Sequence, residues 1–332
     1  MKGVVLAAGF GKRLLPLTDS IPKPLLPLGC MPLIGYSLKL LASVGIRDIF
    51  MNIHYLAEQL PNALGDGSDY GVKITYYKEK VILGTGGGLK NMQKDLGDDD
   101  FVVINSDTVL DVDLHAVLRA HKASNAMATM VLRNRPEHDN FGVIGVNEEG
   151  YISQILDKKL EGQKIFPLMF TGLQVLSNKF LDYLPQTGES CVVRQGYLAA
   201  LTKRELLYGY ISRDYWVDAG TPKSYWQCNM DALSAKKPLI RYADPLLNNF
   251  IESYSHTKIL QTTYIARDVK IAASVRLGPN VLLSEHVEVR ENCYIANSVV
   301  LPGTKIRPDV SLNHCLVTPQ TTLNLSSNRD DS

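Results

Sequence analysis

The chain has 332 residues, more than a single hydrophobic core usually supports, so we expect one large domain and a second module. Its formal net charge is +1 and its basic residues are scattered, which gives no reason to expect nucleic acid or an anionic membrane as a partner. Its five cysteines are widely spaced and include no Cys-x-x-Cys pair, which argues against a disulfide framework and a structural zinc site.

The first predicted element is a strand over residues 4–6, followed at once by a glycine-rich loop. The strand is a short apolar run of the kind that is buried on both faces, and Gly9-Phe10-Gly11 interrupts it. Glycine lets backbone N–H groups approach a phosphate closely, and nearby cations add positive charge. Arg13 is one such cation, and Lys23 is another, aimed by the two prolines that flank it. We interpret this stretch as a phosphate-binding loop.

Two common phosphate loops do not fit this stretch. A dinucleotide fingerprint requires a third glycine where the chain has Leu14, and a Walker loop requires Ser or Thr where it has Arg13. The run LAAGFGKRL, followed by PKPLLPLG, instead resembles the signature of the sugar-1-phosphate nucleotidyltransferases, although many members have Thr or Glu at the position of Lys12. The resemblance implies that Arg13 and Lys23 are catalytic. It also implies a set of nucleotide-binding residues in the same loop, namely Leu6, Ala7, Ala8, Gly9 and Gly11.

The next hundred residues alternate between predicted helices and strands. We expect helices from about Pro32 to Gly45, over 56–64 and over 87–96, and strands over 48–53, 72–77 and 101–104. This alternation predicts an α/β fold, a Rossmann-like and mainly parallel sheet with helices on both faces. Ligands bind beyond the carboxyl ends of such strands, a rule that places residues 9–13 and 105–107 on one rim.

Asp107 follows the strand over 101–104 and should project from that rim. A carboxylate at this position can bind a Mg2+ ion that bridges phosphates. The alternative is a helix cap, a role for which Asp113 is better placed because it directly precedes the next predicted helix. The family resemblance implies the metal role for Asp107.

The segment LGTGGG, residues 83–88, lies between a predicted strand and a predicted helix. Consecutive glycines there would let a nucleobase or ribose lie flat against the backbone, and the alternative is a flexible loop without a ligand. The resemblance implies that the base contacts this segment, in a form slightly closer to the guanylyl-transferring members. The residues concerned are Gly84, Thr85, Gly86 and Gly87.

From Met127 the predicted strands become shorter, over 127–132, 143–146 and 151–156, which indicates an antiparallel extension over a sugar pocket. A charged pair that ends a strand, such as Asp157-Lys158, is most often a solvated turn, and Lys159 leaves the register open by one residue. The resemblance implies that this pair and three further residues bind the sugar phosphate. The full set is Gly142, Asp157, Lys158, Thr171 and Gly172.

Asp218 precedes a Gly-Thr-Pro turn that would hold it in fixed geometry. The alternative is a helix cap, a role for which Thr221 with Pro222 is better placed. The resemblance implies that Asp218 is the second magnesium-binding aspartate and that Asp107 and Asp218 bind one ion. In the implied reaction a sugar phosphate oxygen attacks the α-phosphorus in line and pyrophosphate leaves, which requires positive charge more than a protein nucleophile. His121 shares an apolar helical face with Val117, so we predict a packed histidine.

From Ile265 to Leu301 an apolar residue recurs at every sixth position. This is the hexapeptide signature of a left-handed parallel β-helix, and two to three coils fit the repeat. Some proteins with such helices are acyltransferases, but neither His286 nor His314 has an evident acidic partner here. We therefore expect the β-helix to support subunit association and the protein to be a homo-oligomer.

The expected organisation is a nucleotidyltransferase domain over 1–238, a linker over 239–263, a left-handed β-helix over 264–320 and a disordered tail over 321–332. GTP with mannose 1-phosphate is the expected substrate pair, and the alternative is a uridylyltransferase acting on glucose 1-phosphate or an amino sugar 1-phosphate. An alternative of another class is a non-catalytic nucleotide-sugar-binding regulatory subunit, which would not need both cations and both aspartates. The chain offers no signal peptide or membrane span, so we expect a cytoplasmic protein with no membrane partner.

Overall fold

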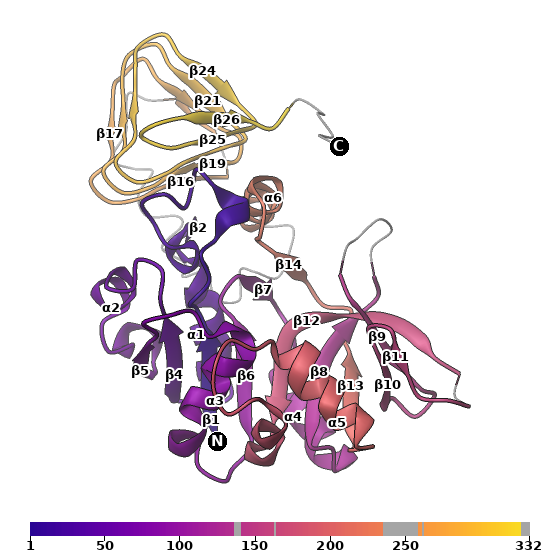
Figure 1. The fold of residues 1–332 in the computed structure, drawn as a ribbon. Helices are drawn as coiled ribbons and strands as arrows, with labels where there is room; N and C mark the ends of the chain where they lie inside the picture. Colours follow the sequence, from indigo (N-terminus) through magenta and orange to yellow (C-terminus); the bar gives the residue numbers. More distant parts are fainter. Residues whose placement is uncertain (136–140, 163, 235–257, 261, 327–332) are drawn as a thin grey trace. The chain divides into compact units, whose positions relative to one another are not determined.

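A computed structural model describes residues 1–135, 141–162, 164–234, 258–260 and 262–326 (Figure 1). The chain forms two compact units, and each is described on its own. The first unit comprises residues 1–10 and 37–216, and the second comprises residues 11–36 and 217–332. Most of the predicted linker over 239–263 lies outside the described residues. Within the described ranges, no helix has the length and apolar character needed to cross a membrane.

The first unit is built on a ten-stranded mixed sheet. Its central strands run parallel in the order β6-β1-β4-β5, and β12 pairs with β6 in the antiparallel direction. Further antiparallel pairs join β12 to β9 and β8 and β9 to β10, so both the predicted parallel sheet and its antiparallel extension are confirmed. The strands are β1 (Lys2–Leu6), β4 (Asp48–Ile53), β5 (Lys73–Lys78), β6 (Phe101–Asn105), β8 (Ala128–Arg133), β9 (Val143–Val146), β10 (Ile152–Ile155), β11 (Lys158–Lys159), β12 (Phe166–Leu176) and β13 (Leu207–Ile211).

Helices cover both faces of this sheet. Val4 of β1 shares a hydrophobic cluster with Leu89 of α3 (Gly84–Leu96). Gly3 faces the other way, and a Cβ there would lie 3.1 Å from Leu41 of α1 (Leu33–Ser43). Since successive residues of a strand point to opposite faces, α1 and α3 lie on opposite sides. The remaining helices of this unit are α2 (Gln59–Leu64), α4 (Leu114–Ser124) and α5 (Leu198–Thr202).

Helix α2 begins later than predicted. The sequence placed its start at Leu56, but Leu56 has a φ of 47°, a left-handed conformation that an α-helix cannot contain. The first three residues of the expected helix therefore form a turn, and the helix proper begins at Gln59.

The central strands end level with one another. Leu6 is in register with Asn52 of β4 on one side and with Asn105 of β6 on the other. The backbone N–H of Ser106 then donates to the carbonyl of Leu6 at 3.1 Å. The residues that follow these three strands therefore share one edge of the sheet, as the sequence predicted for the first loop and the segment at Asp107.

The second unit contains a parallel β-helix, the helix α6 (Pro222–Leu233) and the segment over residues 11–36. Three parallel sheets line the β-helix, in the orders β15-β18-β21-β24, β16-β19-β22-β25 and β17-β20-β23. Their strands are β15 (Lys258–Ile259), β16 (Thr263–Ile265), β17 (Lys270–Ile271), β18 (Arg276–Leu277), β19 (Val281–Leu283), β20 (Glu288–Val289), β21 (Tyr294–Ala296), β22 (Ser298–Val300), β23 (Lys305–Ile306), β24 (Ser311–Asn313) and β25 (Cys315–Val317). The segment over 11–36 adds the short pair β2 (Pro27–Leu28) and β3 (Met31–Pro32). Two further strands belong neither to the ten-stranded sheet nor to the β-helix, namely β7 (Thr108–Leu110) and β14 (Trp216–Asp218).

The β-helix departs from the predicted repeat in three respects. It has begun by Lys258 rather than at 264, so two of its sheets contain four levels instead of two to three. Leu283 pairs with Val300 rather than Leu301, because this coil is one residue shorter than the coil between Ile265 and Leu283. The predicted tail is also shorter, since β26 (Thr322–Asn324) pairs with β25 in the antiparallel direction. Residues 327–332 lie outside the described part.

The outer surface of one β-helix sheet is apolar and covered. Val281 and Leu283 belong to the interior cluster of the β-helix, so the intervening Leu282 points outward, yet it is fully buried. Helix α6 contacts β19 and β22 on this surface. The indole Nε1 of Trp226 in α6 donates to the carbonyl of Asn297 at 2.8 Å, between β21 and β22. The β-helix is thus packed onto the helix that begins just after Asp218.

Candidate active site

The loop after β1 is held tightly within the first unit. Leu6, Ala7 and Ala8 are buried, and the backbone N–H of Ala7 donates to Oδ1 of Asn52 at 2.9 Å. Next to Gly9, a Cβ would meet no atom within 4 Å, so space for a ligand remains beside the backbone at that position. This arrangement is compatible with the nucleotide-binding role that the sequence gives to these residues.

The cationic part of the loop belongs to the second unit. Gly11 has a φ of 66°, and a Cβ there would lie 3.2 Å from the Cβ of Lys23, so the loop folds back closely on itself. Lys23 opens a single 3-10 turn over Lys23–Leu25, with Pro22 before it. Its side chain is only 9% exposed. The prolines therefore fix a lysine that is largely buried.

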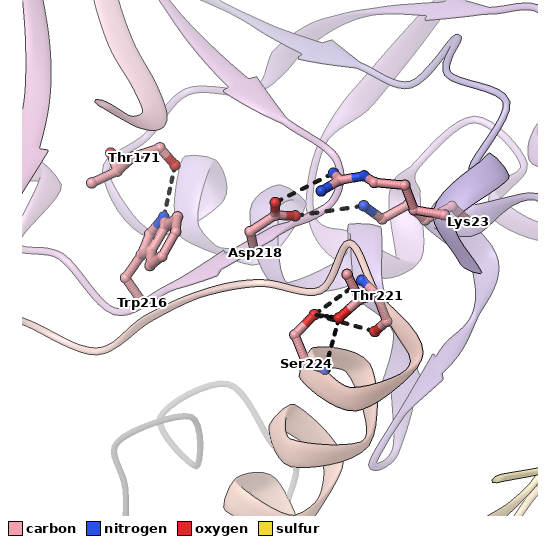
Figure 2. A network of polar contacts seen from close by, with 7 residues as sticks. Lys23, Thr171, Trp216, Asp218, Thr221 and Ser224 are labelled. Atoms are coloured by element: carbon pink, nitrogen blue, oxygen red, sulfur yellow. Dashed lines mark hydrogen bonds and ion pairs between the residues drawn. The ribbon is translucent and has the colours of Figure 1, made fainter. Parts of the chain in front are cut away.

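Asp218 meets both predicted catalytic cations. Its Oδ1 lies 3.6 Å from Nζ of Lys23, and its Oδ2 lies 3.5 Å from Nη2 of Arg13 (Figure 2). Gly220 permits this approach, because a Cβ there would lie 2.6 Å from Arg13 and 2.8 Å from Asp218. One carboxylate and two cations thus form a compact charged cluster within the second unit.

Helix α6 is capped by Thr221 and not by Asp218, as the sequence predicted. Thr221 Oγ1 accepts from the backbone N–H of Ser224 at 3.2 Å, and Ser224 Oγ accepts from the backbone N–H of Thr221 at 3.0 Å, which makes a capping box (Figure 2). Pro222 occupies the first turn. Asp218 therefore remains available to the charged cluster.

Asp107 occupies the tight turn between β6 and β7 and is half-buried. The cap of the following helix is Asp113, whose Oδ1 accepts from the backbone N–H of Ala116 at 3.0 Å, as predicted. Gly172 packs against the same turn, because a Cβ there would lie 2.8 Å from Thr108 and 2.9 Å from Asn105. Within the first unit, the fold therefore brings the predicted sugar-binding Gly172 next to the turn that carries Asp107.

The glycine segment is the first turn of α3 and not a loop before it. The sequence placed the helix start near Gly87, whereas α3 begins at Gly84. A Cβ on Gly84 would lie 2.5 Å from the carbonyl oxygen of Ser190, and one on Gly87 would lie 2.6 Å from that of Gly188. Thr85 Oγ1 accepts from the backbone N–H of Val192 at 2.9 Å. These glycines let the segment over 188–192 cross the start of the helix.

Most of the predicted sugar-binding residues lie in the antiparallel part of the first unit. Asp157 and Lys158 are exposed at the hairpin between β10 and β11, where Ile155 pairs with Lys158. Thr171 is buried, and its hydroxyl donates to the carbonyl of Val131 at 2.8 Å, so that hydroxyl has a structural partner. Its own carbonyl accepts from the indole of Trp216 at 2.8 Å (Figure 2). Gly142 is exposed beside Phe141, whose ring packs edge-on against Trp216.

Sequence reasoning missed a buried polar pair beside the first loop. Asn52 and Glu79 are 3% and 4% exposed, and Nδ2 of Asn52 donates to Oε1 of Glu79 at 2.8 Å. Neither residue lies in a motif, and only their position after two predicted strands hinted at the rim. They connect the two segments to which the sequence assigns the nucleotide.

The histidines and cysteines of the described residues form no metal cluster. Among the described residues, no group of three or more His, Cys, Asp or Glu side chains is arranged to bind a metal ion by itself. His121 is packed as predicted, with Nδ1 at 2.8 Å from Thr129 Oγ1, and burial lowers its pKa although Asp100 opposes the shift. All five cysteines are free thiols, as expected.

Comparisons with known proteins agree with this architecture. A family model described as nucleotidyl transferase matches residues 2–235, and one described as GMPPB C-terminal domain matches residues 259–328. A solved structure from Bacillus anthracis, named for glucose-1-phosphate thymidylyltransferase and bound to sucrose, has a TM-score of 0.61 and 27% identity, covering 70% of this chain and 95% of that one. HddC from Yersinia pseudotuberculosis shares the fold, with a TM-score of 0.58 and 23% identity over 69% of this chain and 97% of its own.

Several proteins of assigned activity are also similar. UTP-glucose-1-phosphate uridylyltransferase of Synechocystis is 31% identical over 248 residues, covering 70% of this chain and 64% of that protein. Mannose-1-phosphate guanylyltransferase of Mycobacterium tuberculosis is 32% identical over 236 residues, covering 71% and 65%. Mannose-1-phosphate guanyltransferase of Yarrowia lipolytica is 34% identical over 248 residues, covering 72% and 66%. The chain thus spans slightly less than two thirds of the length of these three relatives.

Proposed function

Because the chain belongs to the nucleotidyl transferase family, we propose that it transfers a nucleotidyl group from a nucleoside triphosphate to a sugar 1-phosphate, releasing pyrophosphate. The observation that carries the proposal is the charged cluster in which Asp218 lies 3.6 Å from Lys23 and 3.5 Å from Arg13. Transfer to a phosphate oxygen needs cations at the phosphates and accurate positioning more than it needs a protein nucleophile. The loop and the cluster supply these two requirements.

In this proposal Arg13 and Lys23 act on the triphosphate. Lys23 is largely buried, so its charge is poorly screened and suits the charge that develops near the reacting phosphorus. Arg13 is 64% exposed and can follow the departing pyrophosphate. Lys158, exposed at its hairpin, is the proposed partner of the incoming sugar phosphate. Residues 6–9 and Gly11 remain the proposed nucleotide contacts, with the open space beside the backbone of Gly9 available to the phosphates.

Asp107 and Asp218 are the carboxylates that we propose for a Mg2+ ion. The donor set fits this ion, because Mg2+ prefers oxygen ligands and commonly uses one or two carboxylates together with substrate phosphates. The surroundings of Asp218 also fit, since its oxygens already face positive charge at 3.5 and 3.6 Å. When bound, the ion would neutralise charge on the phosphate oxygens.

GTP and mannose 1-phosphate are the proposed substrates. Two of the similar proteins are named for this guanylyl transfer, and the C-terminal match is to the GMPPB C-terminal domain. UTP with glucose 1-phosphate is the second candidate, because the similar Synechocystis protein is named for it. Gly84 to Gly87, Thr171 and Gly172 remain the proposed base and sugar contacts. A cytoplasmic location and a homo-oligomer formed through the β-helix also stay predictions.

The test is pyrophosphate release over a matrix of four nucleoside triphosphates and several hexose 1-phosphates, with and without Mg2+. We expect one pair to dominate and EDTA to abolish turnover. Asp107→Ala and Asp218→Ala should each abolish turnover without loss of the folded state by circular dichroism, and near-normal rates in either variant would remove that residue from the metal site. If no pair turns over, the non-catalytic nucleotide-sugar-binding subunit becomes the better explanation.

A further inference from the structure

Asn52 and Glu79 form a fully connected polar pair inside the first unit. Oδ1 of Asn52 accepts from the N–H of Ala7 at 2.9 Å, and its Nδ2 donates to Oε1 of Glu79 at 2.8 Å. Oε2 of Glu79 accepts from the N–H of Leu83 at 2.8 Å. Since the N–H of Ala7 can only donate, Oδ1 of Asn52 faces it and the amide of Asn52 has one permitted orientation.

The pair joins two segments that are far apart in the sequence. Ala7 lies in the loop after β1, and Leu83 directly precedes the glycine-rich start of α3. The backbone of Glu79 is also held, because its N–H donates to Ile53 at 2.9 Å and its carbonyl lies 2.9 Å from Nδ1 of His54. A buried polar network in which every group has a partner fixes one geometry more sharply than apolar packing does.

The surrounding side chains pack tightly against this pair. A Cβ at position 88 would lie 2.7 Å from Nδ2 of Asn52 and 3.0 Å from Oε1 of Glu79, so only glycine fits there. The ring of His54 in turn packs edge-on against Phe10 in the first loop, with centroids 5.3 Å apart. The first loop is therefore anchored to the ends of β4 and β5 at both Ala7 and Phe10.

We infer that Asn52 and Glu79 are positioning residues that set the spacing between the loop at Ala7 and the glycine segment at Leu83 and Gly84. The inference rests on the proposed function, in which both segments bind the nucleotide. Because both side chains are at least 96% buried, they act through the backbone N–H groups that they hold rather than by contact with the triphosphate. Misplacement of these segments by a fraction of an ångström should weaken nucleotide use and spare the sugar phosphate.

The network can be inverted without loss of a hydrogen bond, which gives a sharp test. Asn52→Asp sets two carboxylates against each other, and Glu79→Gln places its amide N–H against either Asn52 or Leu83. In the double variant the carboxylate at position 52 accepts from Ala7 and from the new glutamine amide, whose oxygen accepts from Leu83, so every donor again has an acceptor. Each single variant should raise the KM for the nucleoside triphosphate about tenfold and leave that for the sugar phosphate unchanged, and the double variant should recover to within about threefold of the parent.

A matched control is Asn178→Asp. Asn178 is likewise an asparagine that joins segments through its side-chain amide, because its Nδ2 donates to the carbonyls of Gln93 at 3.0 Å and Gly97 at 2.6 Å, at the opposite end of α3. It should lower the melting temperature and leave both KM values unchanged. Titration calorimetry with GTP and UTP, without sugar phosphate, repeats the comparison independently of turnover.

The outcomes distinguish a failure of the inference from a failure of the proposed function. A parent protein that binds nucleotide but turns over no pair contradicts the proposed transfer, while the calorimetric comparison still decides the role of the pair. Two outcomes would show that Asn52 and Glu79 have a structural role alone and that the inference is wrong. In the first, Glu79→Gln, the milder change, lowers the melting temperature without raising the KM for the nucleoside triphosphate. In the second, the double variant loses as much nucleotide affinity as the two single variants together.

Discussion

Replacement of Lys23 by methionine should make the nucleotide-free protein bind divalent cations more tightly while it destroys turnover. In the proposed metal site without nucleotide, Lys23 and the ion would be alternative partners of the same carboxylate, because Nζ of Lys23 lies 3.6 Å from Oδ1 of Asp218. The side chains of Lys23 and Asp218 are only 9% and 18% exposed, so water screens this attraction weakly. Methionine is an unbranched side chain only one heavy atom shorter than lysine, and it removes the charge.

The magnitude follows from the distance between the two charges. At 3.6 Å, Coulomb's law with an effective dielectric constant of about 20 gives an attraction of about 4–5 kcal/mol, before the cost of desolvation. A net change of about 1.4–2.8 kcal/mol in metal binding corresponds to a rise of about tenfold to a hundredfold in affinity. Loss of a preorganised positive group at the reacting phosphates should lower kcat by about a hundredfold or more.

Arg13 provides an internal comparison. Its guanidinium lies at a similar distance, 3.5 Å, from the other carboxylate oxygen but is 64% exposed. Solvent screening reduces such pairs to about 0–1 kcal/mol, so Arg13→Met should raise metal affinity by less than about fivefold. Lys12→Met removes an equal charge from the same loop and serves as the control for a general electrostatic effect.

The assay is a Mn2+ titration of the nucleotide-free protein, with free Mn2+ measured by its electron paramagnetic resonance signal. The expected order of affinity is Lys23→Met first, then Arg13→Met, then Lys12→Met and the parent protein together. If Lys23→Met binds Mn2+ no better than Lys12→Met, the carboxylate of Asp218 is not the metal ligand with which Lys23 competes, and the reasoning fails.

Three further predictions concern stability. Thr221→Ala should lower the free energy of unfolding by about 1 kcal/mol in urea titrations, because α6 loses its capping box, and an unchanged midpoint would contradict this. Trp226→Phe should cost about 1 kcal/mol in the same assay, because the half-buried carbonyl of Asn297 loses its donor, whereas a neutral effect would mean that water replaces the indole. Burial lowers the pKa of His121 below its ordinary value of 6.5, so the unfolded chain binds this proton more readily and stability should fall as the pH drops below about 6.5. His121→Gln should flatten this part of the stability profile in melts between about pH 5 and 7, and a parallel profile would contradict the assignment.

Several local features of the candidate site were predictable because their signals lie in neighbouring residues. Lys23 stands between prolines, and the structure fixes it as a largely buried side chain. The two helix caps were also predictable, since a helix start requires a side chain at a defined offset, and Asp113 and Thr221 met that requirement. Alternation of apolar runs and helical faces likewise predicted the central sheet.

The rest depended on contacts that no local pattern encodes. Asn52 and Glu79 are 27 positions apart and look like ordinary polar residues, and only the register of β4 and β5 brings them together. The glycine segment was expected to precede the helix, but the small size of Gly84, Gly86 and Gly87 allows the close approach of residues 188–191, which are distant in the sequence. The sequence did not reveal the shortened coil before Val300, because Leu301 continues the sixfold period and is itself buried.

The division of the chain into two units keeps the charged cluster together. Arg13, Lys23 and Asp218 all belong to the second unit, the one that includes the β-helix. The β-helix packs on α6, the helix that begins just after Asp218, through Trp226 and through the buried outer surface of β19 and β22. A subunit or ligand that binds the β-helix therefore binds the same compact unit that carries both cations and their carboxylate.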